Sequence, residues 1–169
     1  MGKEGNNKLH HRISKGQNDL CKNWNDLKIK MDKLTDDIVN YNEDLKKIGF
    51  NSLKFWKRWF VKSKTKIFDS DLFNVVQKDS SKSINKFNHL IDDFNEIGKG
   101  ISDFGSLINT TFELMDLKTI TDIQMSKILH KFETDIKKLL ESYSIINSQY
   151  EELRKETDGI ILQVNEFKG

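Results

Sequence analysis

The stretch KILHKFETDIKKLLESYSIINSQYEELRKETDGIILQVNEF, residues 127–167, decides the fold of this chain. Apolar and aromatic residues recur along it at alternating spacings of four and three, and polar residues fill most positions between them. The track, which starts two residues earlier, consists of Met125, Leu129, Phe132, Ile136, Leu139, Tyr143, Ile146, Tyr150, Leu153, Thr157, Ile160, Val164 and Phe167. Only Thr157 interrupts its apolar character. This period predicts one helix with a coiled-coil seam over residues 119–167, about 70 Å long at 1.5 Å per residue.

A second track with the same spacing lies nearer the start of the chain. Its members are Leu20, Trp24, Leu27, Met31, Leu34, Ile38, Tyr41, Leu45 and Ile48. It predicts a helix over residues 17–49, because Gly49 suits a left-handed cap at a helix C-terminus. The preceding residues 1–16 are polar and partly basic, so they are predicted to be a disordered basic tail.

A third apolar stripe lies between these two tracks and predicts a helix over residues 82–116. The stripe comprises Ile84, Phe87, Ile91, Phe94, Ile101, Ile108, Phe112 and Met115, and Leu90, Ile97, Phe104 and Leu107 widen it. Gly98 and Gly105 stand within it, although each interior glycine costs a helix about 1 kcal/mol relative to alanine. Either a neighbouring helix requires small residues there, or the helix bends. KDSSKS, residues 78–83, resembles a linker before this helix.

These patterns together predict an all-α fold, an elongated antiparallel three-helix bundle with coiled-coil heptad seams. Residues 17–169 would form a single helical domain. The chain contains no proline, so no obligate helix breaker interrupts the helices.

Residues 50–80 are predicted to form an elbow between the first two helices, and KFWKRWFVKSKTK at residues 54–66 is its most unusual part. This stretch, the aromatic-basic segment, combines four large aromatic residues with six cations and has no acid. Its candidate lipid- or partner-binding residues are Lys54, Phe55, Trp56, Lys57, Arg58, Trp59, Phe60, Lys62, Lys64 and Lys66.

Three interpretations of this segment are open. The aromatic residues could close one end of the bundle as core, since such side chains bury large areas. They could instead lie at a membrane interface with the cations facing anionic lipid. Stacking on nucleic acid is a less favoured interpretation, because no recognised module is present and the rest of the chain is acidic.

Charge is distributed unevenly along the chain. Up to Phe68 there are 16 Lys and Arg against 8 Asp and Glu, which gives +8; the remainder has 12 against 18, which gives −6, and the sum is the net +2. The first part of the chain should therefore prefer anionic partners.

Groups that could perform catalysis do not converge in the sequence. His10, His11, His89 and His130 lack the close spacing of a metal pair, and the single cysteine, Cys21, allows no intrachain disulfide. The glycines of GKGISDFG lie inside a helical pattern, so they do not predict a phosphate loop. We therefore predict a protein that is not an enzyme and uses no cofactor or metal. No apolar run is long enough to span a membrane, and we expect a cytoplasmic location, with peripheral attachment at a membrane as one option.

The stretch NEIGKGISDFGSLINTTFEL, residues 95–114, followed by residues 127–153, resembles the BAR-domain superfamily of the arfaptin and sorting-nexin type. The matching features are Ile97-Gly98-Lys99, Phe104 with Gly105, and heptads containing Tyr143 and Tyr150. The resemblance implies a dimer of three-helix protomers that binds curved anionic membranes. It also implies that Trp56 and Trp59 insert among lipids while the cations face the headgroups, these being Lys54, Lys57, Arg58, Lys62, Lys64 and Lys66.

The function expected from these observations is that of a non-enzymatic, membrane-peripheral helical scaffold, and a homodimer is predicted. The alternative is a coiled-coil adaptor or assembly subunit that binds a helical protein partner, with the aromatic-basic segment as bundle core. A helical toxin or secreted effector is a third possibility.

Overall fold

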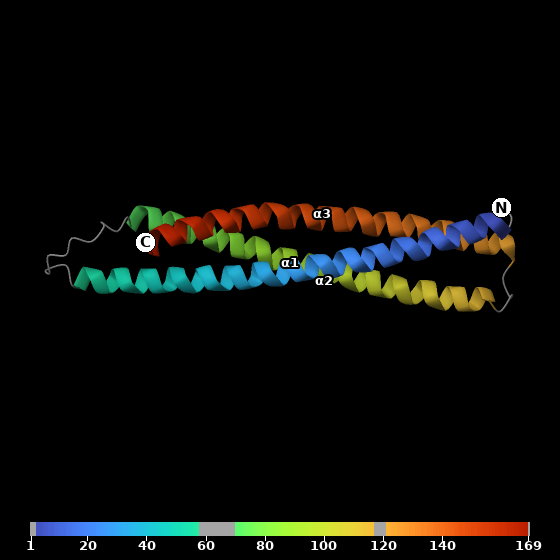
Figure 1. Cartoon of the computed structure of the whole chain (residues 1–169), viewed down its shortest axis with the longest axis horizontal. Coiled ribbons are helices and arrows are strands. Elements are labelled where there is room, and N and C mark those ends of the chain that lie inside the picture. The colour runs from blue at the N-terminus through green and yellow to red at the C-terminus, as the bar shows by residue number, and fades with distance from the viewer. Residues whose placement is uncertain (1–2, 58–69, 117–120, 169) are drawn as a thin grey trace. The chain divides into compact units, whose positions relative to one another are not determined.

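The structure is a computed structural model that describes residues 3–57, 70–116 and 121–168. These residues form three helices, α1 (Lys3–Lys57), α2 (Ser70–Asp116) and α3 (Asp122–Lys168), which pack against each other (Figure 1). No strand occurs among the described residues. The predicted all-α three-helix bundle is therefore confirmed.

The helices group into two units. Unit 1 combines residues 3–29 of α1 with residues 91–116 of α2 and 122–148 of α3. Unit 2 combines residues 30–57, 70–90 and 149–168 of the same helices. Each helix therefore contributes one part to each unit, and each unit has its own core.

Both cores are built from the residues that recur at spacings of three and four, since these positions share one face of a helix. In unit 1 the buried apolar residues are Leu9, Ile13, Leu20, Leu27, Phe94, Ile97, Ile101, Phe104, Ile108, Leu129, Phe132, Ile136 and Ile146. In unit 2 they are Met31, Leu34, Ile38, Tyr41, Leu45, Phe73, Val76, Phe87, Leu90, Tyr150, Leu153, Ile160 and Val164. Most members of the two long tracks are thus core residues, as their spacing predicts.

The first sixteen residues differ from the prediction. Where a disordered basic tail was expected, α1 begins at Lys3, and Leu9 and Ile13 are buried in unit 1. The reason is that Asn6, Leu9, Ile13 and Leu20 continue the seam of α1 towards its N-terminus. Only two apolar residues carry the pattern there, so the surrounding polar composition concealed it.

The elbow of residues 50–80 is also shorter than predicted. α1 continues through Gly49 to Lys57, so Gly49 caps no helix end, and α2 begins at Ser70. KDSSKS is helical, because Ser80 and Ser83 are buried seam residues of α2 in line with Phe73, Val76 and Phe87. The burial pattern of α2 follows Leu90, Ile97 and Phe104, whereas Ile84, Ile91 and Phe112 are only half-buried at its flank.

Gly98 and Gly105 lie at close contacts between α1 and α2 in unit 1. A Cβ atom at Gly98 would stand 2.5 Å from Cζ2 of Trp24, and one at Gly105 would stand 2.7 Å from Nε2 of Gln17. The same two side chains donate hydrogen bonds to backbone carbonyl oxygens of α2, Trp24 to Phe94 at 3.2 Å and Gln17 to Ile101 at 2.9 Å. Each accepting carbonyl is four residues before a glycine, so the missing Cβ gives the donor access to it. Close packing, the first of the two interpretations, is the one the structure supports.

The start of α3 carries a capping box. The Thr121 hydroxyl accepts a hydrogen bond from the backbone N–H of Gln124 at 3.3 Å, and the Gln124 side chain accepts one from the N–H of Thr121 at 3.2 Å. This reciprocal pair satisfies two N–H groups that have no partner within the helix. It explains why α3 starts at Asp122, a few residues after the predicted start at residue 119.

Candidate functional site

Lys54, Phe55, Trp56 and Lys57 of the aromatic-basic segment lie in the last turns of α1. The positions of their side chains are not among those the structure describes. The other six predicted binding residues lie outside the described residues altogether; they are Arg58, Trp59, Phe60, Lys62, Lys64 and Lys66. The prediction that these ten residues form a binding site stays a prediction.

Unit 2 has an aromatic core layer where Gly49, Phe73 and Phe167 meet. Phe73, near the start of α2, is buried, and its ring packs edge-to-face on Phe167 of α3 with centroids 5.8 Å apart. On the α1 side, a Cβ at Gly49 would lie 3.2 Å from the Phe73 ring, so the glycine allows the ring to approach α1 closely. Described residues of all three helices therefore form the core at this level.

A groove of about 350 Å³ lies between α2 and α3 of unit 2. From α2 it is lined by Asp79, Lys82, Ser83 and Lys86, and from α3 by residues 155, 156, 159, 160 and 163. Glu156 is one of the lining residues, and it accepts a hydrogen bond from Lys86 at 2.8 Å and one from the buried Ser83 at 3.2 Å. The Glu156 partner raises the pKa of Lys86 above its usual value.

The spacing of residues in the sequence does not predict this groove. The available signal was the small size of opposed residues, since Ser83 occupies a seam position and the next two seam positions carry Phe87 and Leu90. On α3, a Cβ at Gly159 would find nothing within 4 Å. Small residues on both helices leave the space unfilled, but the sequence alone does not say which residues face each other.

The core of unit 2 also contains polar groups. Thr157 is fully buried, and its hydroxyl has no hydrogen-bond partner among the described residues. Arg154 pairs with Asp37 of α1 at 2.8 Å and also with Asp158, one turn further along α3. Hydrogen bonds to Asp158 and Asp37 raise the pKa of Arg154, although its partial burial acts in the opposite direction. This ion pair joins α1 to α3 at the side of the core.

All three tyrosines of the chain should titrate above their ordinary pKa of 10.0. Burial is the main cause for Tyr41, Tyr143 and Tyr150, since it disfavours the charged phenolate. The folded state therefore holds these protons more tightly than the unfolded state. We expect stability to be unchanged by tyrosine titration below pH 10 and to fall as the pH rises above it.

Phenolate absorbance and helical circular dichroism, followed together through alkaline pH, measure this effect. The variant Tyr41→Phe should lose part of the alkaline fall, because Tyr41 is the most deeply buried of the three. Native tyrosines that all ionise at an ordinary pKa while the helices remain intact would contradict the prediction.

The described residues hold no group of three His, Cys, Asp or Glu side chains that could bind a metal ion. His10, His11, His89 and His130 are exposed, and the ring of His10 lies against Phe112 with centroids 3.7 Å apart. Cys21 is half-buried, and its sulfur accepts a weak hydrogen bond from Gln17 at 3.7 Å. The prediction of a non-enzymatic protein therefore rests on the sequence.

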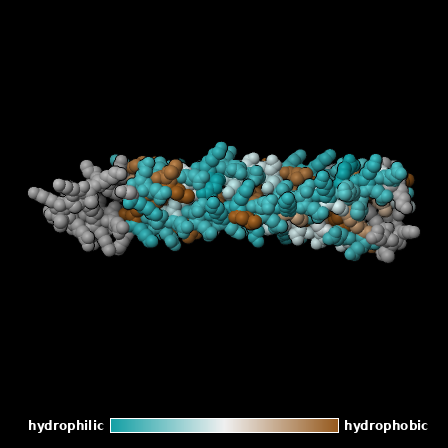
Figure 2. Space-filling view, in the orientation of Figure 1, coloured by the Kyte–Doolittle hydropathy of each residue, from teal (hydrophilic) through white to brown (hydrophobic). Residues whose placement is uncertain are grey.

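The surface of the described chain is mostly hydrophilic, and apolar residues form separate small patches on the face shown in Figure 2. The most exposed large apolar side chains are Ile29, Ile123, Leu162 and Ile145. Single exposed residues of this kind are normal for a protein surface. Within the described ranges, no helix has the length and apolar character needed to cross a bilayer.

Comparisons with known proteins give no family for this chain. No protein-family model matches it, and no significant similarity appears among curated proteins or among solved structures. The resemblance to the BAR-domain superfamily accordingly stays a prediction.

Proposed function

We propose that this chain is a non-enzymatic, membrane-peripheral helical scaffold that binds anionic lipid through the aromatic-basic segment, residues 54–66. The observation that carries the proposal is that most seam residues of α1, α2 and α3 are buried within their own units. Helices whose apolar faces are already covered need no further partner in order to fold. Binding is then left to surfaces outside the seams, and the aromatic-basic segment has the most distinctive composition among them.

The physical argument joins the two halves of that composition. Tryptophan and phenylalanine favour the headgroup level of a bilayer, where one part of the ring is apolar and another remains wet. Each lysine or arginine near an anionic surface contributes about 1 kcal/mol. Six cations without an intervening acid, even after screening by salt, are enough for weak and reversible attachment.

Co-sedimentation with anionic and neutral vesicles tests the proposal. The parent should bind anionic vesicles, and rising salt should weaken the binding. Trp56→Ala/Trp59→Ala should weaken it at least about tenfold, which corresponds to 1.4 kcal/mol, while the helical circular dichroism remains. A parent that does not sediment with anionic vesicles would overturn the proposal, and a double variant that loses its helix would assign these aromatics to the core.

Trp24 provides an internal control, because the only other tryptophans of the chain are Trp56 and Trp59. In unit 1 the Trp24 ring is stacked on Phe94 with centroids 4.7 Å apart. In Trp56→Phe/Trp59→Phe, Trp24 is the only tryptophan left, and its emission should not move when vesicles are added. The parent emission should shift to the blue under the same conditions.

The alternative function, a coiled-coil adaptor or assembly subunit, would need a seam open to a partner helix. Because most seam residues are already buried within the chain, the adaptor is the less favoured of the two functions. The expected homodimer can be checked by light scattering across a range of protein concentrations. A stable dimer with unchanged vesicle binding is compatible with the scaffold, whereas a dimer that does not bind vesicles favours an assembly subunit.

A further inference from the structure

We infer that the groove between α2 and α3 of unit 2 is a binding site for a small, hydroxyl-bearing phosphate ester. This inference goes beyond the proposed function and does not depend on the aromatic-basic segment. The volume of about 350 Å³ lies at the lower end of the range for small-molecule pockets. A ligand of a few carbon atoms with one phosphate group has a suitable size.

The charges in the groove favour an anion. Three lysines, Lys82, Lys86 and Lys155, and two acidic residues, Asp79 and Glu156, line the groove. Both oxygens of Glu156 are already engaged, one by Lys86 and the other by Ser83. The remaining groups are two lysines and one aspartate, which leaves a net positive charge for the ligand.

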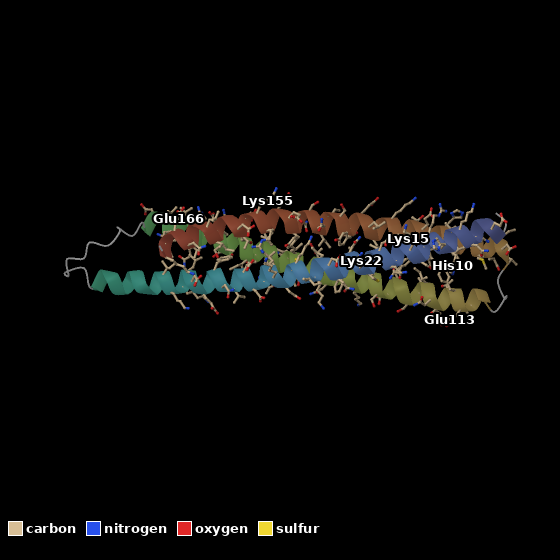
Figure 3. All side chains as sticks on the ribbon, viewed as in Figure 1. His10, Lys15, Lys22, Glu113, Lys155 and Glu166 are labelled. Carbon is tan, nitrogen blue, oxygen red and sulfur yellow. The ribbon has the colours of Figure 1, made fainter. Side chains whose placement is uncertain are left out.

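Lys82 and Lys155 are placed to supply that charge. They line the groove from opposite helices, both are exposed, and neither forms an ion pair with another described residue. Figure 3 shows Lys155 on the outward side of α3. Lysine is a common phosphate ligand in proteins because it acts as a compact charge with three donors.

The rest of the groove suits the organic part of such an ester. Gln163 offers an amide donor and acceptor, and Glu156 can accept a further hydrogen bond from a ligand hydroxyl. Ile160 is largely buried and gives the groove an apolar element. At Gly159 the absence of a side chain keeps the space open. A bare inorganic anion would use only the charges, so an ester should bind more tightly than phosphate itself.

Titration with glycerol 3-phosphate, followed by calorimetry or by NMR chemical shifts, tests the inference, with inorganic phosphate as the comparison probe. We expect saturable binding of the ester that Lys82→Gln/Lys155→Gln weakens at least tenfold. Gly159→Leu should abolish binding, because its side chain grows into the open space while the exchange of glycine favours the helix. Lys22→Gln, on an exposed lysine of unit 1, should leave binding unchanged.

Absence of saturable binding to the parent would overturn the inference, and so would equal binding to Gly159→Leu. Anionic vesicles distinguish the two sources of the phosphate ester. If Gly159→Leu also weakens vesicle binding, the ligand is a lipid headgroup; if it weakens only the soluble probe, the ligand is a soluble ester. Trp56→Ala/Trp59→Ala tests the proposed function alone, because these residues are not part of the groove. If this variant loses vesicle binding and still binds the ester, the two activities use separate sites, so either proposal can fail without the other.

Discussion

Replacing Gly98 by alanine should lower the free energy of unfolding by about 1 kcal/mol, although alanine is the better helix former. A Cβ at this position would lie 2.5 to 2.8 Å from three atoms of the Trp24 indole, which is closer than such atoms come to one another. Overpacking a core contact typically costs about 1–3 kcal/mol. The indole would have to move away, and it would then lose its stacking on Phe94 and its hydrogen bond to the Phe94 carbonyl.

These losses, about 1 kcal/mol each, exceed the gain of about 1 kcal/mol that alanine brings to a helix interior. Two further glycines serve as matched controls. Gly105→Ala should be close to neutral, because the atom it meets is the flexible end of Gln17. Gly159→Ala should raise stability by up to about 1 kcal/mol, since its Cβ meets nothing.

Urea unfolding of the three variants, followed by circular dichroism, measures this order. Stabilisation by Gly98→Ala equal to that by Gly159→Ala would show that Trp24 does not hold α1 against α2. Trp24→Phe together with Gly98→Ala completes a double-mutant cycle. The cost of the alanine should fall when the larger ring is absent.

The glycines also show where prediction from sequence stops. A glycine in an apolar stripe indicates either a bend or a close neighbour, and the choice depends on which residue of another helix lies opposite. In unit 1, Gln17 of α1 lies opposite Gly105 of α2, and Trp24 lies opposite Gly98. The two α1 residues are seven positions apart, as are the two glycines, but their order along the chain is reversed. The spacing within one helix could not reveal this alignment.

Spacing alone was sufficient where apolar residues are dense. The tracks in α1 and α3 predicted buried residues such as Leu34 and Leu153 correctly, because a period of three and four allows only one continuous face. It was insufficient where the seam changes to polar or small residues. Asn6, Ser80 and Ser83 are buried. The polar composition of the segments around them had instead predicted a disordered tail at residues 1–16 and a linker at residues 78–83.

The candidate sites divide in the same way. The aromatic-basic segment is evident from composition, since clustered cations and aromatics need no partner helix to be recognised. The α2–α3 groove depends on Ser83 and Gly159 lying on facing helices, which only the structure reveals. The sequence gives the residue types of such a site, but it does not say which residues of two helices lie opposite each other.

Thr157→Val should raise the free energy of unfolding by about 1–2 kcal/mol. Thr157 is the one polar residue in the seam of α3, and it is fully buried. Its hydroxyl makes no hydrogen bond with any described residue, and a buried polar group left in this state costs about 1–3 kcal/mol. Valine has nearly the same shape and the same branching at Cβ, so packing and helix propensity should change little.

Thr134→Val is the matched control. Thr134 is exposed on the same helix, and its hydroxyl donates to the backbone carbonyl of His130 at 3.1 Å, so the exchange should alter stability by less than about 0.5 kcal/mol. Thermal and urea unfolding of both variants give the comparison. If Thr157→Val is no more stable than the parent, the hydroxyl must be satisfied in solution. The buried Ser80 and Ser83 of the same unit would then belong to a hydrated polar layer, and the interruption in the α3 seam would be a stabilising feature.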